Sequence, residues 1–143
     1  MQRRIREAPL FRDRPRPVQV ITGGLVPILF GAVAGIVLGI SAGVYWAVSL
    51  VALIGGVLAG IEHTDGWDGA DRGLVGGTLY GIGLLVAHWV AGTDAQVSLP
   101  GFAPILVVFT AIIGMFAGAL GGRLRRAVME HDRGGPAPKR RPA

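Results

Sequence analysis

Residues 31–43 read GAVAGIVLGISAG, with a glycine at every fourth position: Gly31, Gly35, Gly39 and Gly43. On a helix, residues four apart lie on the same face, so these glycines form a stripe without side chains. Inside a lipid bilayer such a stripe lets the backbone of a neighbouring helix come close. The stretch therefore predicts a membrane helix that packs through its glycine face.

The same four-residue spacing occurs in the other apolar stretches of the chain. Lipid tails are as apolar as leucine, so membrane helices associate through close contact and hydrogen bonds, which small residues permit. We therefore expect glycine-zipper packing of every helix. The predicted helix-packing residues are Gly31, Gly35, Gly39, Gly56, Gly60, Gly73, Gly77, Gly81, Gly114, Gly118 and Gly122.

Charged residues are absent from most of the chain. Of 143 residues, 51% are hydrophobic and 16% are charged, and the ranges 18–61, 73–93 and 95–122 contain no charge. A membrane span needs about 20 apolar residues. The first range holds 44 residues and must therefore turn back once, for which Ser41-Ala42-Gly43 is suited. This pattern excludes a soluble fold.

We expect an all-α membrane protein with four transmembrane helices arranged as two antiparallel hairpins. Pro27 is expected to bend the first helix, because proline lacks the N–H group that a helix interior uses. The last ten residues, 134–143, are expected to be disordered. The expected regions are an N-terminal tail (1–17), four helices (18–40, 44–61, 72–92 and 102–122, within a domain 18–122) and a C-terminal tail (123–143).

Both tails are basic. Residues 1–17 contain six arginines, and residues 123–143 contain seven arginines or lysines. Four helices place both tails on one side, and the positive-inside rule makes that side cytoplasmic. We expect a multi-pass protein of a prokaryotic plasma (inner) membrane whose tails bind anionic lipid headgroups in the bilayer. Nucleic acid is not an expected partner, because no recognition motif is present.

Few polar residues lie within the expected helices, and they form a candidate polar cluster of Ser49, Tyr80, His88 and Thr110. By depth, Ser49, His88 and Thr110 lie toward the outer side, and Tyr80 lies near the bilayer centre. One interpretation is that these groups hydrogen-bond between helices. The other is a polar vestibule in which His88 accepts a proton or binds a ligand, because ionisable residues inside a membrane are often functional.

A second candidate site is the acidic loop between the second and third helices, EHTDGWDGADR at 62–72. Carboxylates and an imidazole can bind a divalent cation, but acids at every third position do not match an EF-hand. The structural interpretation places Asp68 as the cap of the third helix, with Asp71 in its first turn, and pairs Arg72 with Glu62. The candidate loop residues are Glu62, His63, Asp65, Asp68 and Asp71.

The glycine pattern on either side of the acidic loop resembles that of small glycine-rich four-helix prokaryotic membrane proteins of unknown function. It consists of Gly55-Gly56-Val57-Leu58-Ala59-Gly60, then Gly69-Ala70-Asp71-Arg72-Gly73 and Gly76-Gly77, within residues 52–92. The resemblance implies a four-helix membrane fold and no catalytic residue.

Three classes of function follow. The expected function is that of a non-enzymatic integral membrane protein that acts through helix packing, as a homo-oligomer or as an accessory subunit of a larger membrane partner. The alternative is a small channel or transporter whose path is lined by Ser49, Tyr80, His88 and Thr110. An enzyme is not expected, because only the loop 62–72 offers acid–base chemistry and it comes without a nucleophile, a paired second site or an enclosed pocket. We assign no catalytic residue, metal or cofactor.

Overall fold

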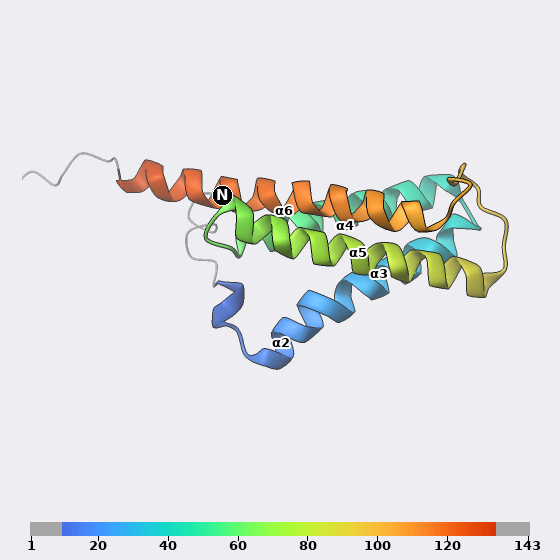
Figure 1. The fold of residues 1–143 in the computed structure, drawn as a ribbon, viewed down its shortest axis with the longest axis horizontal. Coiled ribbons are helices and arrows are strands. Elements are labelled where there is room, and N and C mark those ends of the chain that lie inside the picture. The colour runs from blue at the N-terminus through green and yellow to red at the C-terminus, as the bar shows by residue number, and fades with distance from the viewer. Residues whose placement is uncertain (1–9, 134–143) are drawn as a thin grey trace, which may run out of the picture.

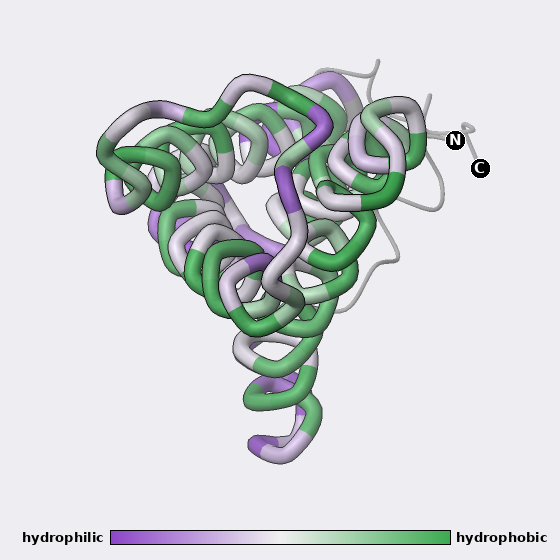
Figure 2. Tube along the Cα trace, turned by 90° about the vertical axis from the view of Figure 1, so that its right-hand side faces the viewer, coloured by the Kyte–Doolittle hydropathy of each residue, from purple (hydrophilic) through white to green (hydrophobic). Residues whose placement is uncertain are grey.

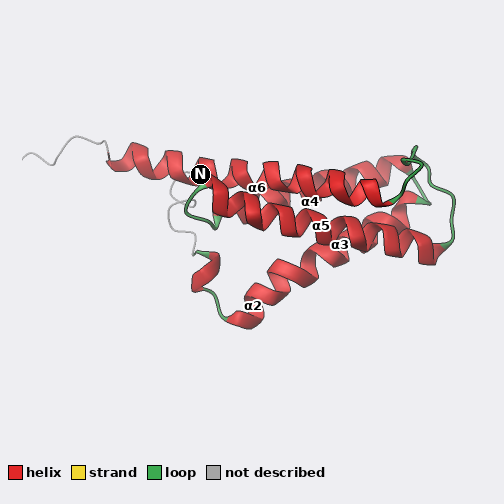
Figure 3. Cartoon of the chain, viewed as in Figure 1, coloured by secondary structure: helices red, strands yellow, loops and turns green. Residues whose placement is uncertain are grey.

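The computed structural model describes residues 10–133, and every regular element in that range is a helix. Four helices are long and apolar enough to cross a membrane, which confirms the all-helical fold class and indicates a multi-pass membrane protein. α2, η2 and α3 together form the first span. The elements are η1 (Phe11–Asp13), α2 (Arg16–Val20), η2 (Ile21–Leu25), α3 (Val26–Leu38), α4 (Ala42–Ile61), α5 (Gly66–Ala91) and α6 (Pro104–Arg133) (Figure 1, Figure 3).

α5 begins earlier in the chain than the sequence pattern predicts. The Asp65 carboxylate accepts hydrogen bonds from the backbone N–H groups of Trp67 (2.8 Å) and Asp68 (3.0 Å). Asp65 is therefore the N-cap, and the expected cap at Asp68 is wrong. The helix includes Asp68 and Asp71, and Gly69 and Ala70, which lie between these two acids, are buried.

α6 continues as a helix to Arg133, beyond the expected end of the fourth helix at 122. Its last turns carry good helix formers and an i,i+4 ion pair between Arg126 and Glu130 at 2.7 Å. The expected disorder of 134–143 concerns residues that lie outside the described part of the chain.

The extent of contact between two helices does not simply follow their order in the chain. α5 and α6 make the most extensive contact, α3 lies mainly against α5, and α4 lies mainly against α6. The consecutive helices α3 and α4 touch each other much less. In the end-on view of Figure 2, apolar positions dominate the helices. Large apolar side chains are exposed on all four spans, among them Val20, Trp46, Val90 and Phe116.

Glycines lie where the backbones of neighbouring helices meet. A Cβ atom on Gly73 would overlap the carbonyl oxygen of Gly114, and one on Gly118 would overlap that of Gly69. On the other side of α5, a Cβ atom on Gly31 would overlap the carbonyl oxygen of Tyr80. The same holds for other predicted packing residues, which would overlap neighbouring backbone: Gly35, Gly60, Gly77, Gly114 and Gly122.

The remaining predicted packing glycines have different surroundings. A Cβ atom on Gly39 would overlap the side chain of Thr93, and one on Gly81 would overlap the Thr110 hydroxyl. Gly56 is less crowded, because a Cβ atom there would lie 3.5 Å from the Ala117 Cβ.

An apolar core closes one end of the bundle. It contains Ala34, Leu38, Tyr45 and Leu84, all of which are fully buried except Tyr45. The connection 92–103 packs Ala95, Val97 and Leu99 against it. The Gln96 N–H group donates to the Leu38 carbonyl at 2.9 Å. We call this the loop end, at the right of Figure 1.

The close contact of α5 with α6 predicts the effect of adding one methyl group. Gly73→Ala is expected to lower the free energy of unfolding by about 1–3 kcal/mol, because the backbone of α6 cannot move away without breaking other contacts. Gly55→Ala is the matched control, since a Cβ atom there would meet nothing within 4 Å. Its effect is expected to stay within about 0.5 kcal/mol.

Unfolding of both variants is measured in detergent by tryptophan fluorescence. Equal stability of Gly73→Ala and Gly55→Ala would show that the α5–α6 contact yields to an added side chain.

Candidate functional site

The polar side chains of the chain concentrate at the end opposite the loop end. η1, the α4–α5 connection and the last turns of α6 lie there, at the left of Figure 1, and we call it the terminal end. Six residues from four separate segments contact one another at this end. We call this set the terminal cluster, and it consists of Phe11, Arg14, Thr22, Glu62, His63 and Arg72.

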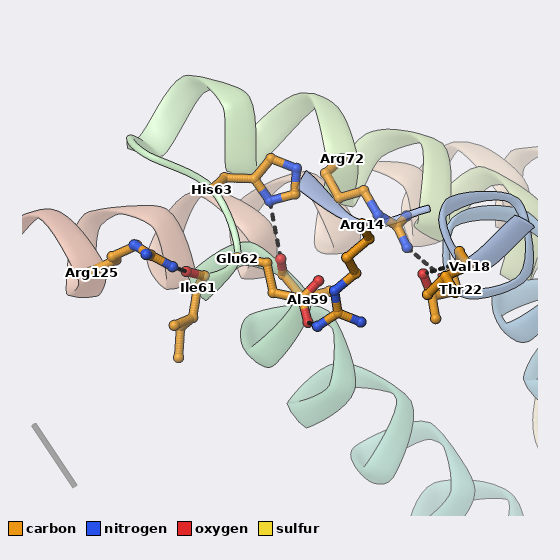
Figure 4. Close-up of polar contacts among 9 residues, drawn as sticks. All are labelled: Arg14, Val18, Thr22, Ala59, Ile61, Glu62, His63, Arg72 and Arg125. Atoms are coloured by element: carbon orange, nitrogen blue, oxygen red, sulfur yellow. Dashed lines mark hydrogen bonds and ion pairs between the residues drawn. The ribbon is translucent and has the colours of Figure 1, made fainter. Parts of the chain in front are cut away.

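Glu62 ties the N-terminal segment to the end of α4. The Arg14 guanidinium donates to the Glu62 carboxylate at 2.5 Å, and the Phe11 N–H group donates to the Glu62 carbonyl at 3.0 Å. The two side chains of the ion pair are 26% and 22% exposed, so water screens the pair only in part. The expected ion pair between Arg72 and Glu62 is wrong, because Glu62 pairs with Arg14 (Figure 4).

The Phe11 ring lies between two basic side chains. It stacks on the His63 imidazole with ring centroids 5.6 Å apart and an angle of 24° between the planes. The Arg72 guanidinium carbon lies 5.3 Å from the centroid of the same ring. This is a cation–π distance, which adds attraction where the cation is partly shielded from water.

Arg72 binds a backbone carbonyl of the first span. Its guanidinium donates to the Thr22 carbonyl oxygen at 2.6 Å (Figure 4). The Thr22 carbonyl is available because η2 is a π-helical turn, in which the Val26 N–H group donates to Ile21, five residues back. The next residue, Pro27, has no N–H group. Arg72 therefore supplies the donor that the helix itself lacks.

Two glycines leave room for this arrangement. A Cβ atom on Gly23 would lie 3.2 Å from the Phe11 ring, and one on Gly76 would lie 3.2 Å from the Arg72 guanidinium. Both distances are tighter than ordinary side-chain contacts. Neither glycine belongs to the predicted packing set, so their role is visible only in the folded chain.

A further arginine holds the end of α4. Arg125 of α6 is only 6% exposed, and its guanidinium donates to the Ile61 carbonyl at 2.8 Å (Figure 4). The last carbonyl groups of a helix lack helical donors and carry partial negative charge, so a cation stabilises them. In the sequence Arg125 is one of several basic residues near the C-terminus, and only the fold brings it to the Ile61 carbonyl.

Several residues of the acidic loop have local hydrogen-bond partners. His63 Nδ1 lies 3.1 Å from the Ala59 carbonyl, and the Thr64 hydroxyl donates to Asp68 at 3.0 Å. Asp65 caps α5, while Asp71 is exposed. Within residues 10–133, no group of three or more acids, histidines or cysteines is placed to hold a metal ion.

A shallow pocket of about 370 Å³ borders the terminal cluster. Its wall combines an aromatic ring, an imidazole, a guanidinium and two carboxylates, so it presents both signs of charge. The lining residues are Phe11, Gly23, His63, Asp68, Asp71, Arg72 and Val75.

The polar residues predicted within the membrane do not form one hydrogen-bonded group in the described chain. The hydroxyl oxygens of Ser49 and Tyr80 lie 3.1 Å apart and join α4 to α5. Thr110 donates within its own helix to the Val107 carbonyl at 3.0 Å. His88 Nδ1 is buried and has no hydrogen-bond partner among residues 10–133. Tyr80, expected to lie apart from the other three, is the residue that pairs with Ser49.

The Ser49–Tyr80 contact predicts a measurable coupling. Ser49→Ala and Tyr80→Phe are each expected to lower the free energy of unfolding by about 1 kcal/mol, because each leaves the other hydroxyl without its partner. The double variant is expected to cost less than the sum, with a coupling of about 0.6 kcal/mol. Thr78→Val with Ser49→Ala is the control pair, because Thr78 bonds within its own helix, and its effects should add. Additive effects for Ser49 and Tyr80 as well would contradict the hydrogen bond.

The contacts of the terminal cluster are of the kind that hold separate segments of a chain together. Guanidinium groups donate to a carboxylate and to a carbonyl, and an aromatic ring fills the space between them. Comparison with known protein families, curated proteins and solved structures finds no match.

Proposed function

We propose that the chain is a non-enzymatic integral membrane protein that acts through helix packing, by associating with a second copy of itself along α4. The outward face of α4 supports this proposal. Ala47, Val51 and Gly55 are spaced four apart and are exposed, so they lie on one face. A Cβ atom on Gly55 would meet nothing within 4 Å. Membrane helices keep small residues where another backbone approaches, so this face is suited to a helix from another chain.

A groove lies next to this face. It has a volume of about 400 Å³ and is bordered by α3 and α4, with the lining residues Leu29, Phe30, Val33, Ala47, Val48 and Val51. Helices pack by placing the side-chain ridges of one into the grooves of the other. In a two-fold dimer the same surface serves both copies, so the Gly55 face of one α4 can meet that of its partner. The helix of a larger membrane partner is the other form of the same proposal.

The proposed placement in the membrane rests on the length of α4 and on the distribution of charge. The helix α4 has 20 residues and is about 30 Å long, which equals the hydrocarbon thickness of a bilayer. The connection 92–103 at the loop end carries a single charged residue, Asp94. We assign the arginine-rich terminal end to the cytoplasmic side of a prokaryotic inner membrane, where its side chains contact anionic headgroups.

Gly55→Leu tests the association. It is expected to weaken self-association in bilayers by at least about tenfold, or 1.4 kcal/mol, because leucine prevents close approach on that face. Val108→Leu, which enlarges an exposed side chain of α6, is the control and should leave association unchanged. Association is measured by energy transfer between labelled copies as the lipid-to-protein ratio is varied.

Cysteine cross-linking locates the interface. The chain contains no cysteine, so each introduced thiol reports alone. Ala47→Cys should yield disulfide-linked dimers in native membranes, and Phe116→Cys on α6 should not. A monomer at all protein densities with both variants would refute self-association, and cross-linking of Ala47→Cys to a larger protein would favour the accessory-subunit form.

A second candidate function, a small channel or transporter, is supported by His88. Its buried Nδ1 has no hydrogen-bond partner in the described chain. The Ser49–Tyr80 pair is a second polar contact within the expected spans. The core at the loop end would have to open for passage, since Leu38 and Leu84 are fully buried there. Proton flux into proteoliposomes that falls to background on His88→Phe would support this function. Flux equal to that of empty liposomes in the unaltered protein would remove it.

A further inference from the structure

We propose that the terminal cluster is a two-state latch, in which the N-terminal segment 10–14 determines whether Arg72 holds the π-helical turn η2 of the first span. Five members of the terminal cluster form the latch: Phe11, Arg14, Thr22, Glu62 and Arg72. It is independent of the association proposed for α4, because the α4 face that carries Gly55 contains none of these residues.

The π-helical turn η2 needs a hydrogen-bond donor from outside the first span. In η2 the Val26 N–H group donates to Ile21 and Pro27 has no N–H, so neither residue donates to the Thr22 carbonyl. A backbone carbonyl without a donor is costly in a membrane. The Arg72 guanidinium donates to the Thr22 carbonyl oxygen at 2.6 Å and so removes that cost. The π-helical turn is therefore stable only while Arg72 remains on Thr22.

The N-terminal segment keeps Arg72 in this position in two ways. Phe11 lies against the Arg72 guanidinium and so covers one side of it. Arg14 occupies the Glu62 carboxylate, whose negative charge also acts on Arg72. The Phe11 N–H group also donates to the Glu62 carbonyl. Glu62 therefore holds both Phe11 and Arg14 in place.

When the segment 10–14 leaves the cluster, the Glu62 carboxylate competes with the Thr22 carbonyl for Arg72. Without Arg14, the Glu62 carboxylate lacks its cation and attracts Arg72, whose aromatic cover leaves with the same segment. Thr22 then loses its donor, and the first span relaxes at η2 into a different direction. Phe11 is also one wall of the shallow pocket, so the pocket widens in the released state. The two states differ in the acceptor that Arg72 binds, which makes them discrete.

Distance measurement between two spin labels tests the latch in the full chain in lipid nanodiscs. Because the chain contains no cysteine, Val20→Cys on α2 and Leu74→Cys on α5 can be labelled specifically, and both positions are exposed. One distance population is expected for the parent pair. Arg14→Gln is expected to add a second, longer population that holds roughly 10% or more of the molecules.

Two variants separate the latch from a general effect of charge or stability. Arg12→Gln removes the same charge from the same segment, but the exposed Arg12 side chain makes no described contact, so one population should remain. Pro27→Ala restores an N–H group to the first span. In that background Arg14→Gln should no longer add the second population, because the helix satisfies its own carbonyl groups.

Far-UV circular dichroism of each variant checks that the helices are retained. A single, unchanged distance in Arg14→Gln would overturn the latch. An equal second population in Arg12→Gln, or failure of Pro27→Ala to suppress the effect of Arg14→Gln, would overturn it as well.

Discussion

Contact between the backbones of α5 and α6 is the constraint on which the other helices depend. Gly69 and Gly73 meet Gly118 and Gly114 with no side chain between them, and the two helices run together over most of their length. α3 then packs on the other glycine-bearing side of α5, and α4 packs on α6. Because each outer helix has its own partner in this pair, α3 and α4 need little contact with each other, and a groove remains between them.

The two ends of the bundle are held by different forces. At the loop end, Leu38 and Leu84 are buried beneath the connection 92–103, so apolar packing closes the structure. At the terminal end, Arg14, Arg72 and Arg125 bind a carboxylate and two carbonyl oxygens. Side-chain packing has few alternatives, whereas a guanidinium can exchange one acceptor for another. Movement is therefore easier to accommodate at the terminal end.

The number and type of helices follow from the sequence because charge-free runs are long and unambiguous. The residue that caps α5 is harder to predict from the sequence, since either Asp65 or Asp68 could be the N-cap. Gly69 is buried within the helix, which favours Asp65. The ion pair of Arg14 with Glu62 and the bond from Arg72 to Thr22 join residues 48 and 50 positions apart. Neither is encoded in a local pattern. Pro27 signals a disturbed helix, but not which side chain repairs it.

Glycine opposite glycine at Gly73 and Gly114 has an evolutionary consequence. In an ordinary interface, a larger residue on one helix is accommodated when its neighbour becomes smaller, and the two positions change together. Here both neighbours are already the smallest residue, so no compensating exchange exists. These positions are expected to stay fixed as related sequences diverge, while the outward-facing apolar positions change freely in size. Covariation between sequences would thus be least informative about the closest contact in the molecule.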